Sequence, residues 1–160
     1  MARDYSGILN NIKRYVPLDK SDEIDFTSIV TTQKVKKRQF IVQPQFVCKY
    51  QTYVVEGALR SYYVGNDGID HTLQFAIEDW FISDFNSYIN QTPATIFVEA
   101  LEDSTIQQIA YKQVEALCSK NPKFERYFRM VAQKAFAYAQ LRILSKLDKT
   151  AEERLDEFML

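Results

Sequence analysis

Residues 53–76 read YVVEGALRSYYVGNDGIDHTLQFA, and this stretch decides the fold class. Aromatic and β-branched residues fill three runs, Tyr53 to Val55, Ala58 to Val64 and His71 to Ala76, as is typical of β-strands. The runs are separated by Gly57 and by Gly65-Asn-Asp-Gly68, residue types that tolerate the positive φ angles of tight turns. The pattern therefore predicts consecutive antiparallel strands.

The strand pattern continues on both sides of this stretch. Phe40 to Val42 predicts an earlier strand, and Thr95 to Leu101 and Thr105 to Ala110 predict two later ones. A short helix is expected from Phe85 to Asn90, because Pro93 breaks the chain soon afterwards. We expect a continuous β meander with one helical interruption.

Helical spacing of apolar residues marks both ends of the chain. From Asp4 to about Val30 the pattern predicts two short helices, separated near Pro17. The helical period returns at Tyr111, and Asn121-Pro122 is a suitable start for a further, long helix. That helix contains no glycine or proline up to the end of the chain.

The long helix is apolar over more than one face, so it is expected to contact two different surfaces. Small residues along it would let a second helix approach closely, and we predict self-association there. The candidate dimerisation residues are Phe128, Val131, Ala132, Ala135 and Ala139. Further on, Thr150 to Glu153 matches a capping box and predicts that a new helix begins at Thr150.

Composition excludes several classes of protein. The 160 residues suffice for one domain with an appendage, and the net charge of -1 provides no general attraction for nucleic acid. The chain has 2 cysteines and 1 histidine, too few for a disulfide framework or an iron–sulfur cluster, and no metal site is predicted. No signal peptide or membrane span is recognisable, so we expect a cytoplasmic protein without membrane contact.

The order of elements and several short motifs resemble the Crp/Fnr family of bacterial transcription regulators. The motifs are YVVEGALR from Tyr53, NDG from Asn66, TLQFA from Thr72, PKFER from Pro122 and KTAEER from Lys149. The last three are similar to the Bacteroidetes branch of the family. The resemblance implies an α+β fold, in which an antiparallel β-roll of the cyclic-nucleotide-binding type has N-terminal helices and a long C-terminal dimerisation helix.

The resemblance also divides the chain into three parts. Residues 1–121 would form the effector-binding-like roll with its N-terminal helices, and residues 122–148 the dimerisation helix. Residues 149–160 would begin a truncated DNA-binding domain. In this family a helix-turn-helix reads the DNA, and only one of its helices fits after Thr150. We therefore expect DNA binding only in a form that carries the rest of that domain.

The resemblance places candidate effector-pocket residues at Gly57, Arg60, Ser83, Asp84, Thr95 and Tyr138. In cyclic-nucleotide-binding relatives a Gly-Glu pair and an arginine hold the ribose and phosphate. Here the pair falls on Ser83-Asp84 and the arginine on Ala94, which removes the cation that would face the phosphate. Cyclic AMP is therefore doubtful as a ligand, and no cofactor is predicted. Arg60 could substitute as the cation only if it faced inward.

Several alternatives remain open from the sequence. The pocket could take an apolar or aromatic effector, given Trp80, Phe81, Phe85 and Phe97, or the roll could be filled and bind nothing. His71 is the only possible histidine ligand for a haem. The leading hypothesis is a non-catalytic regulatory homodimer. The others are a stand-alone module that binds a ligand or a protein, and a cupin-like enzyme, for which no catalytic residues can be named.

Overall fold

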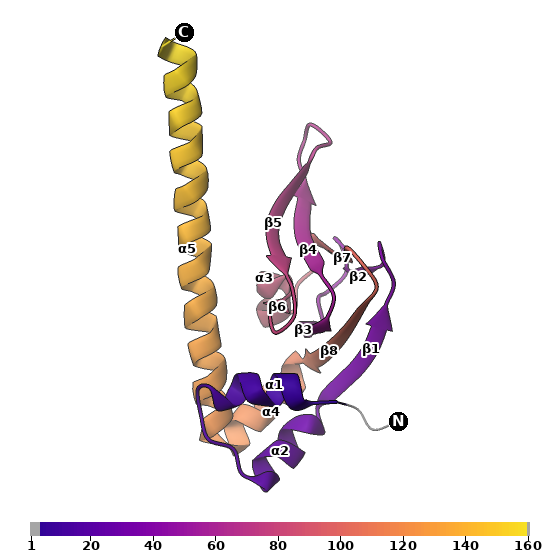
Figure 1. Ribbon diagram of the computed structural model, residues 1–160. Helices are drawn as coiled ribbons and strands as arrows, with labels where there is room; N and C mark the ends of the chain where they lie inside the picture. The colour runs from indigo at the N-terminus through magenta and orange to yellow at the C-terminus, as the bar shows by residue number, and fades with distance from the viewer. Residues whose placement is uncertain (1–3, 160) are drawn as a thin grey trace.

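The computed structural model describes the backbone of residues 4–159 and the side chains of residues 4–147. Its strands form two four-stranded sheets, with helices before and after them (Figure 1). The elements in chain order are α1 (Ser6–Lys13), α2 (Lys20–Thr27), β1 (Val30–Val35), β2 (Phe40–Val42), β3 (Tyr50–Glu56), β4 (Leu59–Val64), β5 (Asp70–Ala76), β6 (Phe81–Ile82), α3 (Phe85–Asn90), β7 (Phe97–Ala100), β8 (Ser104–Ala110), α4 (Tyr111–Lys120) and α5 (Pro122–Met159).

The two sheets form an antiparallel β-roll. One has the strand order β1-β8-β3-β6 and the other β2-β7-β4-β5, and all strand pairs are antiparallel. The predicted hairpin joins β4 to β5, where Val64 pairs with Asp70. Its turn is closed by a hydrogen bond from the Gly65 amide to the Ile69 carbonyl, with Gly68 at a φ of 78°. The fold class expected from the sequence is confirmed. The predicted continuous meander is wrong, because among the described strands β4 and β5 are the only consecutive ones that pair with each other, and the other pairs join strands distant in the sequence.

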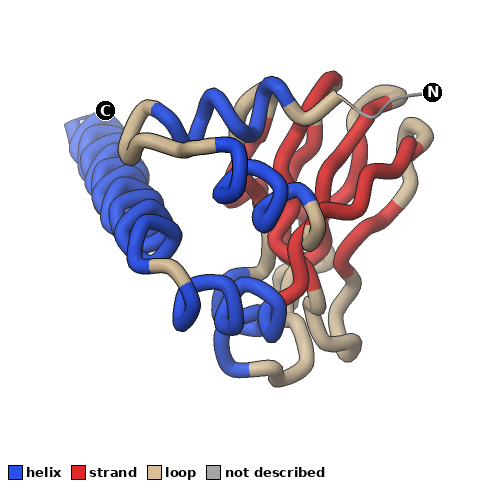
Figure 2. The backbone as a smooth tube through the Cα atoms, turned by 90° about the horizontal axis from the view of Figure 1, so that it is seen from below, coloured by secondary structure: helices blue, strands red, loops and turns tan. Residues whose placement is uncertain are grey.

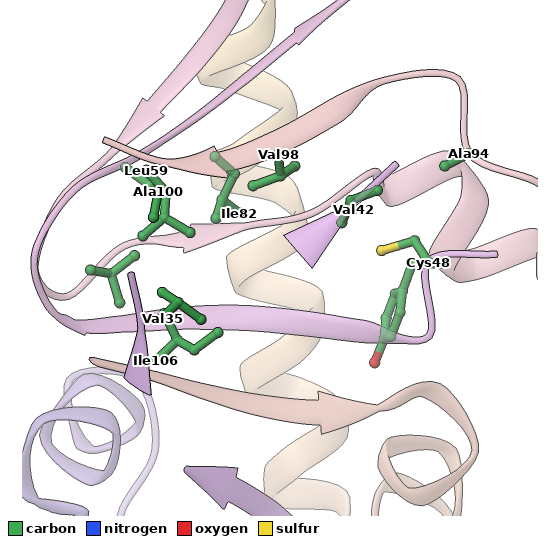
Figure 3. Close-up of a cluster of buried hydrophobic side chains, with 12 residues drawn as sticks. Val35, Val42, Cys48, Leu59, Ile82, Ala94, Val98, Ala100 and Ile106 are labelled. Atoms are coloured by element: carbon green, nitrogen blue, oxygen red, sulfur yellow. The ribbon is translucent and has the colours of Figure 1, made fainter. Parts of the chain in front are cut away.

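The space between the sheets is filled by a compact apolar core (Figure 3). Val54 and Ile106 enter it from one sheet and Leu59 and Val98 from the other, all with 0% of their surface exposed. Burial of each such side chain contributes about 1.5–3 kcal/mol. Alternating residues on each strand therefore point inward.

A second core lies on the outer side of the sheet that contains β3 and β8. There Tyr53 and Ile109 are covered by the helices α1, α2 and α4 and by the beginning of α5. Figure 2, seen from below, shows these helices arranged beside the strands and meeting the base of the long helix. The rings of Phe26 and Phe124 stack with centroids 5.6 Å apart and join α2 to α5. The helices at the two ends of the chain thus form one layer.

Helix α5 has 38 residues and would be about 57 Å long at 1.5 Å per residue. The Asn121 side chain accepts a hydrogen bond from the Lys123 amide at its start, and Phe124 and Tyr127 are fully buried. Beyond Val131 the described side chains are mostly exposed, and the helix extends past the roll (Figure 1). The predicted start of a new helix at Thr150 is wrong, because α5 continues through it; the side chains of the predicted capping box lie outside the described ones.

The strands predicted from the sequence are all present, and two further strands were missed. Val30, which was predicted to end the second helix, instead begins β1 and pairs with Ile109 of β8. The short strand β6 pairs with β3 through Phe81 and Ile82. In both cases a strand from elsewhere in the sequence supplies the backbone partners, and local periodicity does not reveal such pairing. Among the described residues, no helix is long and apolar enough to span a membrane.

Candidate functional site

A cavity of about 830 Å³ lies between the roll and the C-terminal helices. Its roll side is formed by Phe81, Ile82 and Ser83 of the segment after β5 and by Phe85 and Ile89 of α3. Its helix side comes from α4 and α5, including Val114, Cys118, Phe128, Val131, Ala132, Ala135, Phe136 and Ala139. Phe136 is 74% exposed although it lines the cavity, which shows that the cavity is open on that side. The size suits a small organic molecule.

The structure brings together one of the candidate effector residues and all the candidate dimerisation residues. Ser83 lines the cavity opposite Phe128, Val131, Ala132, Ala135 and Ala139. Gly57, Arg60, Asp84, Thr95 and Tyr138 are not among the residues that line it. Tyr138 lies on α5 and is 61% exposed. The same face of α5 is therefore one wall of the cavity and the surface predicted to bind a second helix.

Arg60 lies on the outer face of its sheet, because its neighbours Leu59 and Ser61 point into the roll. Its Nε donates to the Glu99 carboxylate at 2.8 Å, and Nη2 lies 3.3 Å from Asp70. The guanidinium carbon also lies 4.1 Å from the centre of the Tyr62 ring. The inward orientation that a substitute cation would need is not observed, and the charge is already paired on the sheet surface.

Asp84 is buried and acts within its own loop. One carboxylate oxygen accepts the Ser87 amide at 3.1 Å, which caps α3, and the other accepts the Thr95 amide at 3.0 Å. Backbone amides of this kind are the donors that an anionic ligand would need. Here the Asp84 carboxylate already accepts hydrogen bonds from the Ser87 and Thr95 amides, so these amides are not free to bind a ligand.

Ala94 occupies the position at which the resemblance expects an arginine in nucleotide-binding relatives. It is 4% exposed and belongs to the core between the sheets (Figure 3), as do Cys48 and Tyr88. Its amide donates to the Phe46 carbonyl at 2.8 Å. A long cationic side chain at this position would have to leave the packed core, so the surroundings agree with the small residue found there.

Gly57 connects β3 to β4 and has a φ of 112°, in the region that favours glycine. A β-carbon at this residue would lie 2.1 Å from the Ser104 hydroxyl oxygen. The amide of the next residue, Ala58, donates to that same hydroxyl at 3.3 Å. Gly57 therefore has a clear structural role in the turn.

The charges around the cavity are balanced. Arg129 and Arg142 line it together with Glu115 and Glu125, so it has no net positive charge to attract an anion. Burial raises the pKa of the Cys118 thiol to about 11, and the nearby Glu115 and Glu125 contribute in the same direction. That thiol is therefore protonated at neutral pH and a poor nucleophile. In the described part of the chain no group of three or more His, Cys, Asp or Glu residues is placed to hold a metal ion.

Sequence reasoning missed the polar residues of the cavity. Gln51 and Gln74 line it from β3 and β5, and Arg129 and Arg142 from α5. The Gln74 amide donates to the Phe81 carbonyl at 3.1 Å. Nothing in the local pattern distinguishes these residues from ordinary surface positions, because only the packing of α5 beside β5 and β6 brings them together.

A small antiparallel roll followed by a long helix is the fold of cyclic-nucleotide-binding domains and of Crp/Fnr-type regulators. A cyclic nucleotide-binding domain from Methylobacillus flagellatus superposes with a TM-score of 0.74 and 12% identity, over 88% of this chain and 82% of that one. For the catabolite activator protein of Thermus thermophilus the TM-score is 0.69 at 14% identity, over 83% and 61% of the two chains. A Crp/Fnr-family transcriptional regulator from Eubacterium rectale gives 0.65 at 20% identity, over 79% and 59%.

These structures share the fold that the sequence resemblance implied. The present chain spans only 61% of the Thermus protein and 59% of the Eubacterium regulator. No protein-family model and no curated protein matches the sequence. The similarity to these solved structures establishes the fold of this chain and not its signal or partners.

Proposed function

We propose that this chain is the sensor and dimerisation part of a Crp/Fnr-type bacterial transcription regulator, that it is not an enzyme, and that it does not respond to cyclic AMP. The observation that carries the proposal is the cavity, because its two walls are the roll and the apolar face of α5. A molecule or a protein segment between these walls would contact the sensor and the dimerisation helix at once. DNA would be bound through a C-terminal helix-turn-helix that these residues do not include.

A second copy of this chain is the partner proposed for α5. Large apolar side chains are exposed along the helix past the roll, next to its cavity-lining face. Phe136 and Ile143 lie three residues before and four residues after Ala139, and Leu147 follows Ile143 by one helical turn; they are exposed by 74%, 59% and 60%. Single exposed apolar residues are common, but a run along one helix is typical of an interaction surface. Two copies of α5 related by a twofold axis would cover one another with the same residues. The second helix would also close the open side of the cavity.

The proposed exclusion of cyclic AMP depends on three observations. Ala94 is buried where a phosphate-binding arginine would be needed, and Asp84 occupies the Thr95 amide. Arg60 is paired with Glu99 and Asp70 on the outside of the sheet. A phosphodiester in the roll would thus meet a carboxylate in place of a cation, and burying an unpaired anion is costly. An uncharged or apolar effector fits the balanced charges and aromatic lining of the cavity better.

The dimer is tested by sedimentation equilibrium of the 160-residue chain at micromolar concentration. The wild-type chain is expected to be a dimer. Ala135→Glu places a carboxylate on the cavity-facing side of α5 and should weaken dimerisation at least about tenfold, since 1.4 kcal/mol suffices for that.

The matched control is Ala137→Glu, two residues further along the same helix. Successive helix residues are about 100° apart, so Ala137 lies nearly opposite Ala135, and it is exposed. This variant should dimerise nearly as well as the wild-type chain. A monomeric wild-type chain would refute the proposed role of α5. Weakening by Ala137→Glu and not by Ala135→Glu would place the interface on the opposite face, where Leu141 and Leu144 are exposed.

A further inference from the structure

One carboxylate, on Asp79, joins the roll to the N-terminal helix. Its Oδ1 accepts the Tyr53 hydroxyl of β3 at 2.6 Å and the Asn11 side-chain amide of α1 at 3.1 Å. Its Oδ2 accepts a hydrogen bond from Arg14, just after α1. Burial alone would raise the pKa of Asp79, but these three donors outweigh it and hold the pKa below its usual value. The carboxylate is therefore ionised and fully engaged at neutral pH.

The same group of side chains reaches the long helix. The Tyr127 hydroxyl of α5 donates to the Asn11 side-chain oxygen at 2.7 Å. Asn11 thus accepts a hydrogen bond from Tyr127 of α5 and donates one to Asp79. These three residues form a continuous chain of hydrogen bonds. Tyr127 is 0% exposed and Asn11 is 7% exposed. Water therefore competes little for the bond between Tyr127 and Asn11, and a partner lost there would leave a buried polar group unsatisfied. The Asp79 side chain is more open, with 33% of its surface exposed.

Both ends of this chain lie directly before a wall of the cavity. Phe81, Ile82 and Ser83 of the roll wall follow Asp79 within four residues, and Phe128 of the helix wall follows Tyr127. Ring contacts extend the link, since Tyr53 packs on Phe81 at 5.2 Å and Tyr127 on Phe128 at 5.0 Å between centroids. In Figure 1, α1 lies across the base of α5, beneath the strands. The network thus connects the two walls of the cavity through residues that do not line it.

The backbone of Asp79 has a positive φ angle, which is unfavourable for a residue with a β-carbon. Its φ is 74°, a conformation that glycine adopts more easily than a residue with a β-carbon. Hydrogen bonds from the Asp79 amide to the Val54 carbonyl and from the Trp80 amide to the Ile77 carbonyl hold the turn. Glycine would relieve the backbone but would lose the bonds of the Asp79 carboxylate to Tyr53, Asn11 and Arg14. The structure therefore retains a less favourable conformation together with the carboxylate.

We propose that Asp79, Asn11, Arg14, Tyr53 and Tyr127 form the coupling element of this protein, which fixes the position of α5 relative to the Phe81–Ser83 wall and transmits movement of one to the other. The network deepens the function proposed above, since that function names the cavity as the place where the signal arrives. Displacement of the roll wall by an occupant would pull on Asp79 and, through Asn11, on Tyr127. Asp79 and Tyr127 are positioning residues, since neither lines the cavity.

The experiment measures hydrogen exchange of the turn at residues 78–83 in a variant altered only on α5. Tyr127→Phe removes one hydroxyl from the helix. Amides of the turn, including those of Asp79 and Trp80, should then exchange about tenfold faster, because the turn opens more often when one anchor is lost. Trp80 is the only tryptophan in the chain, so its fluorescence anisotropy should fall in the same variant.

The matched control is Tyr15→Phe. The Tyr15 ring packs against Tyr127 with centroids 5.7 Å apart, but its hydroxyl is not part of the network. This variant should leave exchange at residues 78–83 unchanged. Exchange in the β4–β5 hairpin serves as the internal reference, because a general loss of stability would accelerate it as well.

The reverse direction provides an independent test. Asp79→Asn should accelerate exchange in the first turns of α5, residues 124–131, because coupling between two sites acts in both directions. If that variant does not fold, Arg14→Gln removes a single, more exposed arm of the network and should act more weakly in the same direction.

The proposal is wrong if Tyr127→Phe changes exchange in α5 but leaves residues 78–83 and Trp80 as in the wild-type chain. It is also wrong if Tyr15→Phe has the same effect as Tyr127→Phe. Neither outcome bears on whether the chain dimerises. A monomeric wild-type chain with an intact exchange response would instead refute the proposed function and leave the coupling element in place.

Discussion

Gly57 shows at the scale of a single residue how the roll restricts its own sequence. The β-carbon of an alanine here would lie 2.1 Å from the Ser104 hydroxyl oxygen, and the alanine backbone would have to adopt a φ of 112°. We predict that Gly57→Ala lowers the free energy of unfolding by about 3 kcal/mol, from steric overlap together with the unfavourable backbone. Urea unfolding followed by circular dichroism measures this difference.

Gly68 is the matched control for that prediction. It also has a positive φ, of 78°, but nothing lies within 4 Å of a β-carbon built on it. Gly68→Ala should therefore cost only the backbone term, about 1 kcal/mol. Equal effects of the two substitutions would show that the contact with Ser104 adds nothing.

Asp22 connects elements, since it belongs to α2 and holds the start of α5. It completes the capping box with Asp19 and accepts bonds from the Asn121 side chain and the Lys123 ammonium, each at 2.7 Å. The bond from Lys123, followed by the one from the Asp19 amide, holds the pKa of Asp22 below its usual value. The carboxylate therefore stabilises the junction between the N-terminal helices and α5.

We predict that Asp22→Asn lowers stability at pH 7 by about 1 kcal/mol, because the bonds to charged partners weaken but the packing is kept. A lowered folded pKa contributes stability above the unfolded value of about 3.9, and this contribution is lost as the pH falls through the folded pKa. The difference between the two proteins should shrink below about pH 4. Denaturant midpoints at pH 7 and pH 3 test this, and a difference that persists at pH 3 would contradict the ionic origin.

Ligand binding is a property of the whole molecule, and it can be measured as a change in Tm. A ligand present at 100 times its Kd stabilises a protein by about 2.7 kcal/mol, which corresponds to a rise in Tm of about 5 °C or more for a domain of this size. We predict that millimolar cyclic AMP leaves the Tm unchanged, because buried Ala94 and the engaged carboxylate of Asp84 provide no phosphate site. The control is 5′-AMP. A rise of several degrees with cyclic AMP alone would show that a cation reaches the phosphate by another route.

Much of the architecture could be predicted because it depends on local chemistry. The alternation in β3, β4 and β5, the glycine-rich hairpin at Gly65 and the uninterrupted helix after Pro122 follow from residue types a few positions apart. The small residues at Ala132, Ala135 and Ala139 were likewise visible from helical spacing, and they do share one face that lines the cavity.

Other features depend on contacts between distant parts of the chain. The strand β1 exists because Val30 meets Ile109, and the coupling network joins residues 11, 79 and 127. Neither pattern is visible locally, because the partners are separated by dozens of residues. The sequence by itself predicted short antiparallel strands followed by a long apolar helix, and the family resemblance added the β-roll and placed Ala94 where an arginine is expected. Only the tertiary structure decided that Asp84 is satisfied by its own loop, that Arg60 faces outward, and that α5 and the roll enclose a cavity, because burial and hydrogen-bond partners depend on which elements pack together.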